Sequence, residues 1–136
     1  MLHRSIALIF ALLMVAVPAK ADPTAVQSTI TAQLDAFRAG DADAAYALAA
    51  PSIKRMFPTA ERFISMVQSG YRPVYNARNP VFLRSQSIDE TRFAQEVSLS
   101  DQDGQAWTAL YTLALQDDGT WRITGCYLRK ADGSNI

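Results

Sequence analysis

Apolar and polar side chains alternate along three consecutive segments in the second half of the chain. The larger apolar side chains fall mainly on odd-numbered positions in residues 93–99, 107–115 and 121–127. Alternation at every second residue is typical of strands with one buried face. We therefore predict three antiparallel strands whose odd positions face the core, joined by turns at residues 101–104 and 117–120.

The predicted turns determine how these strands pair. Each turn carries a glycine, Gly104 in the first and Gly119 in the second. A type I turn with its glycine in the left-handed region, followed by a bulge, keeps the apolar positions together, whereas a two-residue turn sets them against the polar ones. In the bulged register Gln95 lies opposite Tyr111, and Gly125 is expected on the other side of Tyr111.

The segment before these strands has the pattern of short helices. Val26, Ile30, Leu34 and Phe37 recur at spacings of four, four and three, which places them on one face of an amphipathic helix. Further helices are expected over residues 42–49, 52–56 and 60–69, with Gly70 as the final stop. Helices followed by an antiparallel sheet predict an α+β fold with segregated elements, in which the N-terminal helices pack on a curved sheet of about four strands.

The segment between the helices and the three strands has a weaker pattern. Residues 71–80 are rich in proline and asparagine, and we expect an irregular loop that packs down on the core. A first strand is predicted over residues 81–87 in one of two registers. The favoured register turns Val81, Leu83 and Ser85 inward and leaves Arg84 solvated; the alternative turns Phe82, Arg84 and Gln86 inward, where Arg84 could bind an anion.

Residues 1–21 have the character of a signal peptide. The start, residues 1–4, is positively charged, residues 6–17 are apolar, and Ala19-Lys20-Ala21 has the small-x-small form of a cleavage site. The apolar run is shorter than the roughly 20 residues that span a bilayer. We therefore predict cleavage near Ala21, a periplasmic or secreted location, no stable membrane insertion after cleavage, and one cone-shaped domain over residues 22–136.

Charge and composition argue against several functions. Loss of Arg4 and Lys20 would leave two fewer basic than acidic side chains, with dispersed signs, so we predict no nucleic-acid binding. The single histidine, His3, lies in the predicted signal, and no metal site or cofactor is expected. Cys126 is the only cysteine and is predicted to be buried on the even-numbered face; a reactive thiol is the alternative.

Several short motifs resemble a known family. They are Ala50-Pro51-Ser52-Ile53, Met66-Val67 with Gly70-Tyr71, Pro73-Val74-Tyr75, and Gly119-Thr120-Trp121-Arg122-Ile123-Thr124-Gly125-Cys126. With them, nearly all of residues 22–136 resembles the bacterial family of exported domains catalogued as domain of unknown function 4864. The resemblance implies a nuclear transport factor 2-like, cystatin-like cone, in which a curved sheet wraps a helical layer and leaves a pocket. It implies no activity.

Gln95 and Tyr111 are the strongest candidates for contacting a ligand. They are expected side by side on an otherwise apolar face, and Gly125 beside them supplies no side chain. Missing volume next to two hydrogen-bonding groups favours a small-molecule pocket. The further candidates for its lining are the aromatic residues Trp107, Tyr75 and Phe63. The alternative is that Gln95 and Tyr111 satisfy each other and that Gly125 marks a bulge or a close backbone approach.

These observations favour a non-enzymatic domain that binds a small apolar ligand or a protein partner. A pocket enzyme of the isomerase or dehydratase type is the first alternative, but the inward strand positions offer no Asp, Glu, His or Lys as a base. A structural or assembly module is the second. Leu110 and Leu128 are expected on the outer sheet face beside Cys126, which suggests a homodimer through that face.

Overall fold

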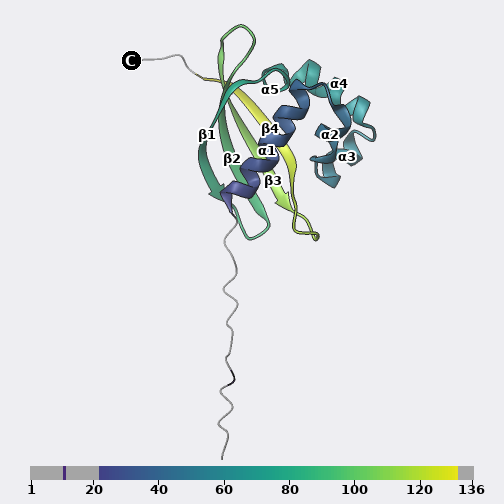
Figure 1. Cartoon of the computed structure of the whole chain (residues 1–136), viewed down its shortest axis with the longest axis vertical. Helices are drawn as coiled ribbons and strands as arrows, with labels where there is room; N and C mark the ends of the chain where they lie inside the picture. The colour runs from purple at the N-terminus through teal and green to yellow at the C-terminus, as the bar shows by residue number, and fades with distance from the viewer. Residues whose placement is uncertain (1–10, 12–21, 132–136) are drawn as a thin grey trace, which may run out of the picture.

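Helices cover one face of an antiparallel sheet in this protein (Figure 1). The structure is a computed structural model that describes Ala11 and residues 22–131, so the predicted signal peptide lies outside the described residues except for Ala11. The helices are α1 (Pro23–Arg38), α2 (Ala42–Ala47), α3 (Pro51–Met56), α4 (Ala60–Gly70) and α5 (Arg72–Tyr75). The strands are β1 (Arg78–Ser87), β2 (Arg92–Ser100), β3 (Ala106–Leu115) and β4 (Trp121–Lys130), in the order β1-β2-β3-β4. The α+β architecture predicted from the sequence is confirmed.

The helix ends follow from local side-chain chemistry. Asp22, Asp41 and Thr59 cap α1, α2 and α4 by accepting hydrogen bonds from backbone N–H groups of the first turn. The stripe that begins at Val26 on α1 is buried, as predicted. The prediction of an irregular loop over residues 71–80 is wrong in part, because α5 forms within this segment and β1 begins at Arg78. Pro73 suits the first turn of α5, where its missing N–H costs no helical hydrogen bond.

The two hairpin turns adopt the predicted bulged form. Gly104 and Gly119 have φ values of 82° and 84°, in the left-handed region that glycine tolerates best. The Gln116 amide donates to the Thr120 carbonyl over 2.8 Å, which closes the second turn. The buried face of β2 and β3 carries the predicted odd positions Phe93, Gln95, Val97, Leu99, Ala109, Tyr111 and Leu113. Gln95 lies opposite Tyr111, as expected.

A bulge in β4 changes which residues face the core. Leu113 pairs with Ile123, but Thr112 pairs with Gly125, so Thr124 is an extra residue. Beyond this point the inward positions of β4 are even-numbered, which the uninterrupted alternation of the sequence does not reveal. The one-residue shift therefore reverses the predicted inward or outward orientation of every β4 residue that follows Thr124.

Four sequence assignments on β4 are consequently wrong. Cys126, not Gly125, pairs with Tyr111. Tyr127 was expected inside but is 70% exposed and lies opposite Leu110 on the outer face. Leu128 pairs with the buried Ala109 and is half-buried on the inner face, so Leu110 and Leu128 do not share the outer surface that suggested a homodimer.

The favoured register of β1 is also wrong at two positions. Val81 and Leu83 are 55% and 48% exposed, whereas Phe82 packs against the core. The pairing of β1 with β2 shifts between Phe82 and Ser85, so Ser85 still reaches the inner side. Arg84 is exposed, as that register predicted.

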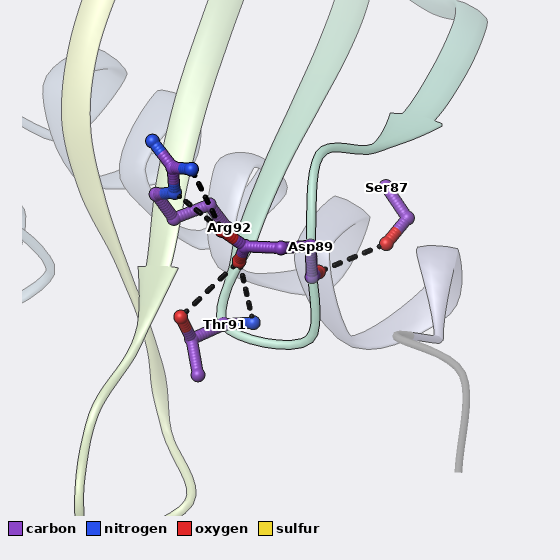
Figure 2. Close-up of polar contacts among 4 residues, drawn as sticks. All are labelled: Ser87, Asp89, Thr91 and Arg92. Atoms are coloured by element: carbon purple, nitrogen blue, oxygen red, sulfur yellow. Dashed lines mark hydrogen bonds and ion pairs between the residues drawn. The ribbon is translucent and has the colours of Figure 1, made fainter. Parts of the chain in front are cut away.

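The turn from β1 to β2 is held by one aspartate (Figure 2). The Asp89 carboxylate accepts hydrogen bonds from the Thr91 amide and hydroxyl and from Arg92 Nε, the last at 2.8 Å. Ser87 Oγ donates to the Asp89 carbonyl over 3.0 Å. The bond from Arg92 is the largest cause of the lowered pKa of the Asp89 carboxyl. These contacts order the end of the sheet that carries β1.

Candidate ligand pocket

A pocket of about 380 Å³ lies between the helical layer and the β4 side of the sheet. Its lining comes mainly from α1, α3, α4, β3 and β4 and is predominantly apolar. The lining residues are Gln33, Phe37, Ile53, Met56, Phe57, Phe63, Met66, Val67, Tyr71, Val74, Tyr111, Ile123, Thr124, Gly125, Cys126 and Tyr127. A pocket is therefore present beside Tyr111, but its wall is mostly built from residues that the sequence did not single out.

The position of α3 beside the pocket is fixed by backbone hydrogen bonds to the edge of β4. Ile123 donates to the Leu48 carbonyl over 2.9 Å and accepts from the Ala50 amide over 2.8 Å. Pro51 follows directly and opens α3, whose residues Ile53 and Met56 then line the pocket. These two hydrogen bonds attach the segment between α2 and α3, residues 48–50, to the edge strand β4.

The exposure of the lining residues defines a floor and a mouth. Phe37, Phe63 and Val67 are nearly inaccessible to water and form part of the floor. Met56 and Tyr127 are 72% and 70% exposed, so they lie at the mouth. The pocket therefore opens between α3 and the second half of β4.

Aromatic rings pack behind this floor. The ring centroids of Phe63 lie 6.2 Å from Phe37 and 5.6 Å from Tyr46. Tyr75 packs on Phe37 at 5.9 Å but does not line the pocket. Of the two aromatic residues predicted from the helical half, Phe63 is thus in the wall and Tyr75 supports it. Such ring pairs stabilise the wall by about 0.5–1.5 kcal/mol each beyond the area they bury.

Tyr111 is the most unusual polar residue of the lining. The side chain is 1% exposed, and its hydroxyl has no hydrogen-bond partner among the described residues. Most buried polar groups are paired, and an unpaired one costs about 1–3 kcal/mol. The hydroxyl lies near the Cys126 thiol, but the two groups form no hydrogen bond of ordinary geometry.

Burial keeps both groups of this pair neutral. Burial, with a smaller effect of Cys126, raises the pKa of the Tyr111 hydroxyl well above 10.0. Burial also raises the pKa of the Cys126 thiol to about 12, which outweighs the opposing effect of Tyr111. Cys126 is therefore a protonated thiol at neutral pH. The residue is half-buried and lies on the inner face of the sheet, not on the outer face that the sequence predicted for it.

Two other polar side chains of the lining, Gln33 and Thr124, already have protein partners. Gln33 is 3% exposed, and its Nε2 donates to the Ala45 carbonyl over 3.3 Å. Thr124 Oγ1 donates to Thr112 Oγ1 over 2.9 Å. Among the described lining residues there is no Asp, Glu, His, Lys or Arg. The pocket therefore offers neutral hydrogen-bonding groups to a ligand but no charge.

Gln95 does not line the pocket, although it lies opposite Tyr111. Its side chain is fully buried and is satisfied on the β1 side. Its Oε1 accepts from Ser85 Oγ over 2.6 Å and from Gln27 Nε2 over 3.3 Å, and its Nε2 donates to the Glu96 carbonyl over 2.9 Å. The alternative interpretation, in which Gln95 and Tyr111 form a hydrogen bond with each other, is therefore wrong.

Trp107 lies outside the pocket. Its Nε1 donates to Asp101 Oδ2 over 2.9 Å, and Lys130 Nζ lies 5.9 Å from its ring centroid. The hydrogen bond from Trp107 is the largest cause of the lowered pKa of the Asp101 carboxyl. The ring thus anchors the turn between β2 and β3 and is structural.

Gly125 lines the pocket, but not by leaving volume beside Tyr111. A Cβ atom at Gly125 would stand 3.0 Å from Thr112 Oγ1. The residue therefore permits a close approach at the bulge, which was the alternative interpretation of this glycine. Cys126 lines the pocket but was not among the predicted pocket residues. The one signal in the sequence that could have pointed to it is its place at the Thr-Gly-Cys end of the family motif.

Metal and membrane sites are not found in the part of the chain that the structure describes. Within Ala11 and residues 22–131, no group of three or more His, Cys, Asp or Glu side chains could hold a metal ion. None of the helices in these residues is long and apolar enough to cross a membrane.

Comparison with known proteins supports the fold. The sequence profile of the family described as Domain of unknown function (DUF4864) matches residues 19–136. No curated protein matches the sequence significantly. An NTF2-like protein of unknown function from Shewanella baltica OS155 superposes with a TM-score of 0.54 at 10% identity, over 80% of this chain and 94% of that chain. At this identity the likeness shows the NTF2-like fold alone.

A second solved structure is less similar. The Δ5-3-ketosteroid isomerase from Mycobacterium sp. superposes with a TM-score of 0.44 at 13% identity, over 77% of this chain and 98% of that chain. Neither structural neighbour therefore supplies a reaction for this pocket. Any function must be argued from the residues that line it.

Proposed function

Because the chain belongs to the domain of unknown function 4864 family, whose description assigns no activity, we propose its function from the pocket: it binds a small, mostly apolar ligand without transforming it. The observation that carries this proposal is the pocket itself, with its apolar lining. Ligand sites in proteins occupy about 300–1,000 Å³ and combine an apolar wall with a few polar groups. The volume of about 380 Å³ and the presence of Tyr111 and Gln33 fit that description.

The lining favours binding over proton transfer. Isomerase and dehydratase chemistry needs a base within hydrogen-bonding distance of the substrate as well as a donor that stabilises negative charge. Tyr111 supplies a neutral donor. The described lining residues supply no carboxylate, imidazole or amine that could accept the proton. The proposed function therefore stops at binding.

We also propose that binding takes place outside the cytoplasm. The support is the signal-like pattern of residues 1–21, together with a family match that begins only at residue 19. Purification of the protein from the periplasmic fraction of its own host, with the new N-terminus identified by mass spectrometry, tests this. We expect the chain to begin at Asp22; recovery of an uncleaved chain from the cytosol would contradict the proposal.

Native mass spectrometry of the same preparation tests binding directly. We expect a mass excess that is lost when the protein is unfolded, which identifies a non-covalent ligand of the size that about 380 Å³ accommodates. Titration with the neutral fluorescent dye N-phenyl-1-naphthylamine then measures occupancy of the emptied pocket, since the dye becomes bright in apolar surroundings. Failure of the dye and of every co-purified ligand to bind would contradict the proposal.

A matched pair of variants shows whether the dye binds in this pocket. Met66 and Ile64 are both half-buried on α4, but only Met66 lines the pocket. We expect Met66→Trp to fill the pocket and weaken dye binding at least about tenfold, while Ile64→Trp has little effect. Equal effects of the two substitutions would place the dye elsewhere.

A further inference from the structure

We infer that the ligand is uncharged and carries an acceptor oxygen, such as a ketone oxygen, that receives a hydrogen bond from the Tyr111 hydroxyl. This inference rests on the proposed function and names the class of ligand for the same pocket. It is carried by one buried donor that has no partner in the described part of the chain and by the absence of charged side chains among the described lining residues.

The Tyr111 hydroxyl is a hydrogen-bond donor that the folded protein does not use within the described residues. Tyr111 is a lining residue whose hydroxyl oxygen is buried and unpaired among the described residues. A buried polar group without a partner costs about 1–3 kcal/mol of desolvation, so the hydroxyl destabilises the empty protein. A ligand that brings an acceptor converts this cost into a hydrogen bond. The hydroxyl therefore favours ligands with an acceptor over hydrocarbons of the same shape.

A ligand must move a neighbouring group to reach the Tyr111 hydroxyl. The oxygen has less than 1 Å² of accessible surface, so even a water molecule does not reach it in the empty pocket. Cys126 lies beside it and also lines the pocket. The thiol is attached through a single rotatable bond and forms no hydrogen bond of ordinary geometry with the Tyr111 hydroxyl. We assign Cys126 as the group that the ligand oxygen displaces.

The described lining residues carry no charged side chain. A carboxylate or phosphate that enters an apolar site pays a large desolvation cost unless a cation or several donors meet it. The described lining has no Lys, Arg or His, and the amide nitrogen of Gln33 is already bonded to the Ala45 carbonyl. The pocket is thus suited to a neutral oxygen and unsuited to an anion.

The test compares two probes with the same carbon skeleton, decalin and its ketone decalone, by displacement of N-phenyl-1-naphthylamine. The variant is Tyr111→Phe, which removes only the hydroxyl. We expect decalone to bind about tenfold more weakly to Tyr111→Phe than to the unmodified protein, whereas decalin binds the two proteins equally. Comparing each probe across proteins cancels the different solubilities of the two compounds.

A second variant tests the role of the thiol. Cys126→Ala removes the group beside the hydroxyl, so we expect tighter decalone binding, by about threefold or more, on the scale of part of one hydrogen bond. This gain must disappear in the double variant Tyr111→Phe/Cys126→Ala, because no hydroxyl is left to reach. A gain that persists in the double variant would overturn the assignment of Cys126.

The outcomes separate the two proposals. If the dye and decalin bind but Tyr111→Phe leaves decalone affinity unchanged, the inference about the acceptor fails and the proposed binding function stands. Stronger binding of the carboxylic acid of decalin than of decalone at pH 7 would likewise overturn the inference. If neither the dye nor either probe binds to the folded protein, the proposed function itself fails. Circular dichroism of each variant establishes that it is folded.

Discussion

Gln95 and Tyr111 are neighbours across two strands, yet the structure treats them in opposite ways. Gln95 has hydrogen-bond partners for both its oxygen and its nitrogen, supplied by α1, β1 and its own strand. Tyr111 has none among the described residues. Both side chains are almost inaccessible to water. The difference lies in what faces them, because Gln95 points toward a filled edge of the sheet and Tyr111 belongs to the pocket wall.

This contrast shows that burial of a polar residue does not by itself identify a ligand site. The Gln95 side has β1, whose shifted pairing brings Ser85 and the Arg84 carbonyl within reach. The Tyr111 side has the β4 bulge, which places a thiol where a stronger hydrogen-bonding group could have stood. An internal network completes the core in the first case. On the Tyr111 side, one buried hydroxyl remains without a hydrogen-bond partner among the described residues, next to the pocket.

The largest effect is expected from Gln95→Leu. This substitution removes the partner of Gln27 and Ser85 and leaves backbone carbonyls of β1 without a donor, so we expect a loss of about 3 kcal/mol in the free energy of unfolding. Urea unfolding measures it. The control is Gln27→Ala, which removes only the single 3.3 Å contact and should cost less than about 1 kcal/mol. Equal costs for the two variants would show that the Gln95 network does not act as a unit.

A smaller effect is expected from Gly125→Ala, which probes the bulge that separates the two environments. The new Cβ would stand 3.0 Å from Thr112 Oγ1, so we expect destabilisation by about 1–2 kcal/mol. The double variant Thr112→Ala/Gly125→Ala removes the crowding atom and should recover most of the loss beyond that of Thr112→Ala alone. Dye binding should survive in the double variant. A Gly125→Ala protein as stable as the original would mean that close approach does not require this glycine.

The bulge also marks the limit of what the sequence could predict. Alternation predicted β2 and β3, and Gly104 and Gly119 predicted the hairpin turns and hence the pairing of Gln95 with Tyr111. The extra residue Thr124 has no comparable signal, because the alternating pattern continues through it. Every residue assignment beyond it was therefore shifted by one.

The pocket was harder to predict than the sheet. Its location depends on two backbone hydrogen bonds between Ile123 of β4 and the segment just before Pro51, which fix the position of α3 beside the sheet. Backbone pairing of this kind between distant segments leaves no residue pattern. Phe63 and Tyr111 were identified because their faces followed from local periodicity, whereas Gly125 was named from a strand register that the bulge shifts. The rest of the wall depends on tertiary packing.

The dependence of the free energy of unfolding on alkaline pH tests whether Cys126, beside Tyr111 at the pocket, is kept neutral by burial. The pKa of the Cys126 thiol rises from 9.0 to about 12 on folding, mainly through burial. Below pH 9 both states hold the proton and stability is unaffected; as pH rises toward 12 the unfolded chain ionises first, so stability falls. At pH 10 we expect a loss of about 1.4 kcal/mol relative to pH 7.

Urea unfolding of the original protein and of Cys126→Ala at pH 7 and pH 10 measures this loss. The variant lacks the thiol, so its decrease over the same interval should be smaller by about 1.4 kcal/mol. Other groups that ionise at alkaline pH contribute to both proteins and cancel in the difference. Identical pH profiles would indicate that the thiol is solvated, and would remove the neutral surroundings argued for Tyr111.

The smallest effect, and the one of opposite sign to Gln95→Leu, is expected from Tyr111→Phe in the absence of ligand. Loss of a buried hydroxyl without a partner should raise the free energy of unfolding by about 1 kcal/mol. Tyr46→Phe is the control, because the Tyr46 hydroxyl donates to the Phe57 carbonyl over 2.6 Å, and its loss should lower stability by about the same amount. If Tyr111→Phe destabilises the protein as Tyr46→Phe does, the Tyr111 hydroxyl has an internal partner. The two buried polar side chains of the sheet would then be alike, and no donor would be left for a ligand.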